Sequence, residues 1–198
     1  MTTVRACPHC AQLTEQPLTC ERCGWRWYAN PLPSAGTLVE RLAPDGEPQV
    51  LLLRRAVEPG LGGWDLPAGY LEAGESAEEG ARRETLEEAG LAVELVRLVG
   101  VYTSRDASAV SCVYLARTLD PSAKVVTDPE SDHHAWVARA DVPAWLPRMA
   151  FRSMAAALDD WAAGRSGIPR DWEHPSGRAA PRRSRAAALH SIRCPTRT

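Results

Sequence analysis

Gly69-Tyr-Leu-Glu-Ala-Gly-Glu75-Ser76 and Arg83-Glu84-Thr85-Leu86-Glu87-Glu88-Ala89-Gly90-Leu91 are the two segments of this sequence that decide its fold. Ser76 and Glu79 lie three residues apart and form a capping box, in which each side chain satisfies a backbone N–H group at the start of a helix. Gly90 can adopt the left-handed conformation that closes a helix. We therefore predict a helix over residues 77–89.

Three carboxylates share one face of this predicted helix. Glu84, Glu87 and Glu88 are spaced i, i+3 and i+4, and like charges at this spacing repel one another. A hard divalent cation such as Mg²⁺ or Mn²⁺ offsets this repulsion, because it takes oxygen ligands and keeps positions for water and substrate phosphates. Arg83, one turn before Glu87, can fix a carboxylate by a bidentate contact. The pattern thus favours a metal-phosphate site over the solvated face that most Glu-rich helices present.

The same residues resemble the signature of the Nudix hydrolases, Gly-x5-Glu-x7-Arg-Glu-U-x-Glu-Glu-x-Gly-U, where U is a large aliphatic residue. The positions that match are Gly69, Glu75, Arg83, Glu84, Glu87, Glu88, Gly90 and Leu91. Thr85 stands in the first U position and is the one departure. That position packs on the side of the helix opposite the carboxylates, so the metal face is expected to be intact.

The resemblance implies an α/β fold, the Nudix α/β/α sandwich with a mixed sheet. It also implies a metal-held water that attacks a diphosphate linkage. Glu84, Glu87 and Glu88 are then the metal ligands, and a backbone carbonyl near Gly69 completes the set. Glu87 or Glu88 also orients the water.

Other residues take supporting roles in this interpretation. Glu75 is expected to hold Arg83 or the loop rather than the metal. Members of the family often supply a base from outside the motif, and Glu130 is our candidate here. His133 and His134 are the alternatives, or they are simply surface histidines.

Composition sets the broad class of the protein. The chain has 198 residues, 44% of them apolar, enough for one sizeable core with a small appendage. Its net charge of −2 gives no case for nonspecific nucleic-acid binding by the whole chain. No stretch approaches the length of a membrane helix, and the N-terminus lacks the apolar core of a secretory signal. We expect a cytoplasmic protein.

Residues 1–33 carry two C-x2-C turns, Cys7–Cys10 and Cys20–Cys23. Together the four thiolates would complete a tetrahedral zinc site with no open position, so the zinc would be structural. A redox role for each C-x2-C is weaker, because the turns are paired and no βαβ pattern surrounds them. We predict a zinc ribbon.

A ribbon of this kind is also compatible with nucleic-acid binding. Trp25, Trp27 and Tyr28 can stack on bases, and Arg22 and Arg26 can meet phosphates. The alternative is that the aromatic side chains pack the ribbon onto the next domain. We favour this alternative because few basic residues accompany them. Nucleic acid is therefore not the expected partner.

Residues 34–164 read as one α/β domain. Strands are predicted over 35–42, 49–54, 92–102, 110–117 and 134–138, with a turn at 43–46. Cys112 is expected to be buried in one of these strands. A loop is predicted to begin at Asp141, and a last helix over 152–163 presents Met154, Ala155, Leu158 and Trp161 to the core. Residues 165–198 are rich in Pro, Gly, Arg and Ser and are predicted to be a disordered basic tail.

The substrate is argued from further resemblance. Trp64-Asp-Leu-Pro-Ala-Gly69 looks like the entry to the motif in nucleoside diphosphate sugar pyrophosphatases. The four-cysteine ribbon, Pro129-Glu-Ser131 and Met149-Ala-Phe151 are similar in layout to the ADP-ribose/FAD pyrophosphatases. The resemblance implies hydrolysis of FAD or ADP-ribose with release of AMP.

Three alternatives remain open. NADH is a weaker substrate candidate, because the Ser-Gln-Pro-Trp motif of NADH pyrophosphatases is missing from the sequence. Other nucleotide sugars are also candidates. A nucleic-acid-binding regulator, with the second domain as its ligand sensor, is the alternative from another class. Many family members are homodimers, but no residue here establishes a dimer.

Overall fold

The computed structural model describes residues 4–6, 13–15, 18–19, 23–24, 26–27, 31–103 and 109–166. These residues fall into two compact units, which are the short strands before residue 30 and a domain that begins at Pro31. None of the described helices is long and apolar enough to cross a membrane.

Helix α1, Ala77–Ala89, forms as the sequence predicts. The Ser76 side chain accepts a hydrogen bond from the Glu79 backbone N–H, and the Glu79 side chain accepts one from the Ser76 backbone N–H. Gly90 closes the helix in the left-handed conformation, with φ 68°. The buried side of α1 consists of small residues, so the helix lies close to the sheet beneath it: Gly80, Ala81, Thr85 and Ala89.

A mixed seven-stranded sheet is the centre of the domain. Its main path runs β11-β6-β5-β10-β9, while β7 pairs with β6 and β8 pairs with β5. Pairing is antiparallel except between β5 and β10, which are parallel. The bounds are β5 Leu32–Leu42, β6 Pro48–Arg55, β7 Trp64–Asp65, β8 Ala68–Tyr70, β9 Val93–Thr103, β10 Ala109–Thr118 and β11 Ser131–Ala138. The predicted mixed sheet is thus confirmed.

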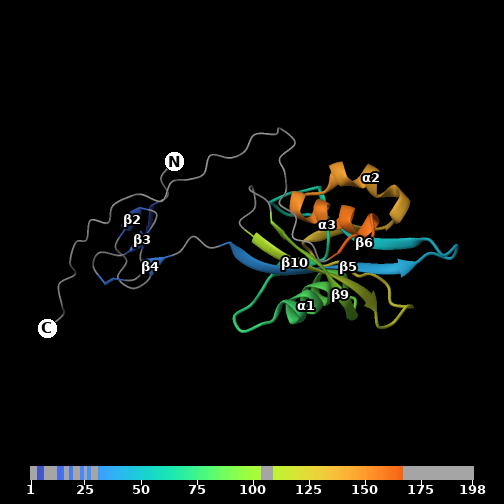
Figure 1. Ribbon diagram of the computed structural model, residues 1–198, viewed down its shortest axis with the longest axis horizontal. Helices are drawn as coiled ribbons and strands as arrows, with labels where there is room; N and C mark the ends of the chain where they lie inside the picture. Colours follow the sequence, from blue (N-terminus) through green and yellow to red (C-terminus); the bar gives the residue numbers. More distant parts are fainter. Residues whose placement is uncertain are drawn as a thin grey trace. The chain divides into compact units, whose positions relative to one another are not determined.

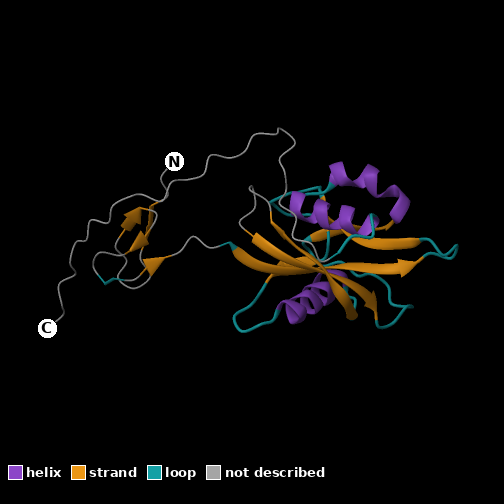
Figure 2. Ribbon diagram, viewed as in Figure 1, coloured by secondary structure: helices purple, strands orange, loops and turns teal. Residues whose placement is uncertain are grey.

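Helices cover both faces of this sheet. Figure 1 shows α1 on one face and α2, Val142–Trp145, with α3, Arg152–Ala162, on the other. The same layers stand out when helices and strands are coloured separately (Figure 2). The loop predicted from Asp141 was wrong, because 3-10 turns over Arg139–Asp141 and Leu146–Arg148 flank α2. Proline in the first turn of a helix costs no hydrogen bond, so Pro143 permits α2.

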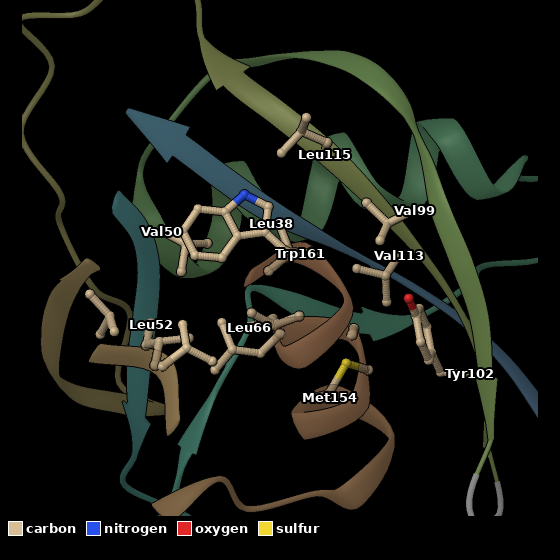
Figure 3. Close-up of a cluster of buried hydrophobic side chains, with 14 of the residues drawn as sticks. Leu38, Val50, Leu52, Leu66, Val99, Tyr102, Val113, Leu115, Met154 and Trp161 are labelled. Atoms are coloured by element: carbon tan, nitrogen blue, oxygen red, sulfur yellow. The ribbon is translucent and has the colours of Figure 1, made fainter. Parts of the chain in front are cut away.

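The main core lies between the sheet and α3. Trp161, Leu158 and Met154 of α3 pack on Leu38, Val50 and other strand residues (Figure 3). Ala157 takes the buried position that we predicted for Ala155, which is half-buried. Cys112 is likewise half-buried rather than fully buried, beside Ala35 and Ala81.

The N-terminal unit contains two short antiparallel ladders. Strand β1, Val4–Ala6, pairs with β2, Leu13–Glu15, and β3, Leu18–Thr19, pairs with β4, Arg26–Trp27. In the sequence, one C-x2-C motif follows β1 and the other follows β3. Cys7, Cys10 and Cys20 lie outside the described residues, as do residues 167–198 of the predicted tail, whereas Cys23 is described and exposed.

Candidate functional site

Arg83 organises the carboxylates of α1. Its guanidinium donates two hydrogen bonds to Glu75, from Nε to Oε1 at 2.8 Å and from Nη2 to Oε2 at 2.9 Å. Nη1 donates to Glu84 Oε1 at 2.7 Å and to Glu87 Oε2 at 3.0 Å. Nη2 also donates to the Tyr70 carbonyl oxygen at 3.0 Å. These contacts raise the pKa of Arg83 and fix one cation at the centre of three carboxylates.

Glu75 plays the part that we predicted for it and holds both Arg83 and the loop. Besides the bidentate contact with Arg83, its Oε2 accepts the backbone N–H of Glu72 at 2.9 Å. Hydrogen bonds from Arg83 and then from this backbone N–H lower the pKa of Glu75 to about 2. Glu75 is therefore an ionised carboxylate whose negative charge is paired with Arg83.

Glu84 lies directly against strand β8. A Cβ built on Gly69 would come within 2.2 Å of the Glu84 carboxylate, so only glycine leaves room for this side chain. Burial raises the pKa of Glu84 despite its contact with Arg83. The Glu84 carboxylate and the Gly69 backbone are thus in contact.

Glu88 reaches the same strand one residue earlier. Its Oε2 accepts the Ala68 backbone N–H at 2.9 Å. Burial, together with the nearby charges of Asp65, Glu84 and Asp128, raises the pKa of Glu88 to about 8 against the opposing effect of the Ala68 N–H. A buried carboxylate with a raised pKa is one whose negative charge lacks compensation.

Asp65 and Asp128 belong to this electrostatic cluster, although sequence reasoning missed them. Asp65 is 7% exposed in strand β7, and burial raises its pKa to about 7 against the smaller opposing effects of the Leu66 N–H and Arg55. Asp128 lies near the C-terminal end of α1, where its backbone N–H donates to the Glu88 carbonyl oxygen at 3.4 Å. Asp65 could have been found from the sequence, because it is a charged residue between the apolar residues Trp64 and Leu66.

Glu130 occupies an exposed turn before β11. Its N–H donates to Asp128 Oδ1 at 3.1 Å, and its carbonyl oxygen accepts the Ala56 N–H at 2.7 Å. In the described part of the chain, no hydrogen bond or ion pair joins the Glu130 carboxylate to the glutamates of α1. His133 contacts Arg54 and Asp132 instead.

Two glycines in the loop before β7 are packed closely against Ala150. A Cβ on Gly63 or on Gly60 would lie 2.9 Å from atoms of Ala150. Ala150 also donates its N–H to the Trp64 carbonyl oxygen at 2.8 Å, next to a parallel bridge between Trp64 and Met149. The Met149–Phe151 segment is therefore packed on the loop that leads into β7 and β8.

Oxygen donors of the kind that a hard divalent cation takes lie together in this group of residues. Glu84 and Glu88 are partly buried oxygen donors beside the Ala68–Gly69 backbone, and burial disfavours their charged forms. Glu87 is close by and more open, with its side chain 58% exposed. Across the described residues, no three Asp, Glu, His or Cys side chains are placed so that they could hold one metal ion. Their carboxylates are instead turned toward Arg83 and the Ala68 N–H.

A comparison with known protein families identifies the domain. The sequence profile of the NUDIX domain matches residues 32–161, more than half of the chain. The chain belongs to the NUDIX domain family. The matched residues include all of the sheet, all of α1 and all but the last residue of α3, and the Nudix resemblance inferred from the sequence is confirmed.

Two curated relatives and one solved structure are similar to this Nudix chain. Over 82 residues it is 35% identical to the ADP-ribose pyrophosphatase of Methanocaldococcus jannaschii, which covers 41% of this chain and 46% of that protein. Over 97 residues it is 38% identical to an 8-oxo-dGDP phosphatase of Mus musculus, covering 48% of this chain and 30% of that protein. The chain therefore spans less than half the length of either relative. The crystal structure of a NUDIX hydrolase from Nitrosomonas europaea is 28% identical, with a TM-score of 0.63 and coverage of 85% and 91%.

Proposed function

We propose that this Nudix protein is a metal-dependent pyrophosphatase that hydrolyses the diphosphate bond of an ADP-linked small molecule, FAD or ADP-ribose first, and releases AMP. The observation that carries the proposal is the placement of Glu84 and Glu88 against the Ala68–Gly69 backbone, where burial disfavours the charged form of both carboxylates. The similarity to a protein named ADP-ribose pyrophosphatase supports the substrate class.

Glu84, Glu87, Glu88 and the carbonyl oxygen of Gly69 are the proposed ligands of Mg²⁺ or Mn²⁺. Such a cation, when bound, stabilises developing charge on phosphate oxygens and lowers the pKa of its water. Arg83 restrains Glu84 and Glu87 through Nη1, so their oxygens are held in place before substrate arrives.

The proton of the attacking water needs a separate acceptor. Glu87 is the exposed carboxylate of the set and is the proposed group that orients this water. Glu130 remains our candidate for the base, supplied by the exposed turn that follows Asp128.

The proposed domain boundaries are residues 1–33 for a zinc ribbon, 34–164 for the Nudix domain and 165–198 for a basic tail. The two antiparallel ladders support a structural zinc held by Cys7, Cys10, Cys20 and Cys23, because each C-x2-C motif follows a paired strand in the sequence. Metal analysis of the purified chain should find about one zinc per molecule, which a Cys7→Ala/Cys10→Ala variant should lose. A chain that lacks zinc would refute this assignment.

The function is tested by measuring product release from a panel of nucleotides, with Mg²⁺ and then Mn²⁺. The panel contains FAD, ADP-ribose, NADH, nucleotide sugars and 8-oxo-dGDP, the last because one relative is named for it. We expect AMP from FAD or ADP-ribose. Failure of every substrate would favour the regulator that uses the Nudix domain as a ligand sensor.

A variant pair separates the metal site from the fold. Glu87→Gln should abolish turnover while leaving thermal unfolding unchanged, because the exposed Glu87 supports metal binding rather than packing. Glu94→Gln, a change at an exposed carboxylate on β9, is the matched control and should keep full activity. Activity retained in Glu87→Gln would contradict the proposed ligand set.

A further inference from the structure

A hollow lies at the tip of the sheet, away from the carboxylates of α1. It encloses about 830 Å³, within the range of small-molecule sites. Its walls come from the ends of β5 and β10, the turn after β5, the loop after β10, and Trp136 of β11. The apolar part of the wall consists of two prolines, two alanines and one leucine: Leu42, Ala43, Pro44, Pro121 and Ala123.

The hollow is separate from the candidate active site. Gly36 is paired with Ala68, next to Gly69, whereas Arg41 lies five residues further along β5. At a rise of about 3.3 Å per residue, this places the two regions about 16 Å apart along the strand. A ligand in the hollow therefore does not depend on the proposed metal ligands.

Charged groups in the wall leave an excess of positive charge. Two arginines, Arg41 and Arg117, and one glutamate, Glu40, line the hollow. Glu40 is already shared, because it accepts the Trp161 indole N–H at 2.9 Å and lies 3.4 Å from Arg139 and 3.6 Å from Arg117. One carboxylate cannot neutralise all of these guanidinium groups.

Arg41 is held in place but not neutralised. Its guanidinium carbon lies 4.0 Å from the centroid of the Trp136 ring, and its Nε donates to Gln49 Oε1 at 2.9 Å. In the described part of the chain, its two terminal nitrogens make no hydrogen bond and it has no carboxylate partner. Desolvation accordingly lowers the pKa of Arg41. A restrained guanidinium with unused donors is preorganised for a phosphate or carboxylate group.

We propose that this hollow binds a phosphate monoester with an apolar or aromatic body, the chemistry of a nucleoside monophosphate. The terminal nitrogens of Arg41 bind the phosphate as a planar fork, and Arg117 adds a second positive charge. The proline and alanine wall contacts the apolar body.

Binding is measured by calorimetry on the full chain in buffer freed of divalent cations, with AMP, adenosine and inorganic phosphate as probes. We expect AMP to bind more tightly than adenosine or phosphate, because it offers both parts of the ligand. Arg41→Gln should weaken AMP binding at least about tenfold, since a charge-assisted contact is lost. Its rate of nucleotide hydrolysis with Mg²⁺ should match that of the wild type.

The matched control is Arg148→Gln, which removes another exposed arginine stacked on a tryptophan, Trp145 at 4.2 Å, outside the hollow. It should bind AMP like the wild type. Unchanged AMP affinity in Arg41→Gln would overturn the proposal, as would equal affinity for adenosine and AMP in the wild type. Absence of AMP binding by the wild type at millimolar concentration would also overturn it.

Discussion

Thr85, the one departure from the Nudix signature, has a buried partner on strand β5. Thr85 and Thr37 are both 0% exposed, and their Oγ1 atoms lie 2.7 Å apart. Thr85 Oγ1 also lies 2.6 Å from the Ala81 carbonyl oxygen, to which it donates. The Thr37 hydroxyl is therefore the donor to Thr85. Because Thr37 donates to Thr85 and Thr85 donates to Ala81, we predict that the family's aliphatic residue at position 85 would destabilise this protein.

The magnitude follows from which group loses its partner. Thr85→Val leaves the Thr37 hydroxyl buried without an acceptor, which costs about 1–3 kcal/mol. Thr37→Val leaves Thr85 bonded to Ala81 and should cost only about 0.5–1.5 kcal/mol. Replacing both threonines removes both polar groups from an apolar interface, so the double variant should lie within about 1 kcal/mol of the wild type.

The assay is urea unfolding of the four proteins, followed by circular dichroism, with the free energies combined in a double-mutant cycle. The cycle should give a favourable coupling between Thr37 and Thr85 of about 0.5–3 kcal/mol. For a domain of this size, Thr85→Val should also lower Tm by roughly 2–10 °C. A neutral Thr85→Val, or a double variant whose loss equals the sum of the single losses, would refute the reasoning.

Two further predictions concern the candidate site. Burial raises the pKa of Asp65 from 3.8 to about 7. Between these two pH values the folded protein holds a proton that the unfolded chain has lost, so the free energy of unfolding falls as pH rises toward 7. Without divalent cations, Asp65→Asn should therefore gain about 2–3 kcal/mol relative to the wild type between pH 5 and pH 8 in urea unfolding, whereas a pH-independent difference would contradict the shift. Gly69→Ala places a methyl group 2.2 Å from the Glu84 carboxylate, and we expect kcat/KM for the best nucleotide substrate to fall at least about tenfold. Full activity in Gly69→Ala would show that Glu84 can leave this position freely.

Local rules were enough to predict the central helix and most strands. The bounds of α1 depend on Ser76, Glu79 and Gly90, which act within one turn of the backbone they cap, and the structure has the predicted bounds. The short helix α2 was missed for the opposite reason. A four-residue helix has little propensity of its own and is stabilised by packing, here of buried Val142 against the core under α3.

The site was only partly predictable for a similar reason. The spacing of Glu84, Glu87 and Glu88 follows from helix geometry, and the Arg83–Glu75 contact follows from the motif. Asp65 lies on another strand, and its interaction with Glu88 depends on how the sheet is paired. Pairing between distant segments is not encoded in the periodicity of either segment, which is why Asp65 was not found.

The parallel ladder between β5 and β10 has a consequence for synthesis of the chain. Ser34 and Ser111, which face each other across this ladder at 2.6 Å, are 77 residues apart in the sequence. At a translation rate of about 5–20 residues per second, β5 is made roughly 4–15 s before the strand that pairs with its inner edge. During that interval, β5 leaves the ribosome with an apolar centre of Leu38 and Val39 and one unpaired edge. Misassembly of the nascent chain should therefore begin at β5, and faster completion of β10 should suppress it.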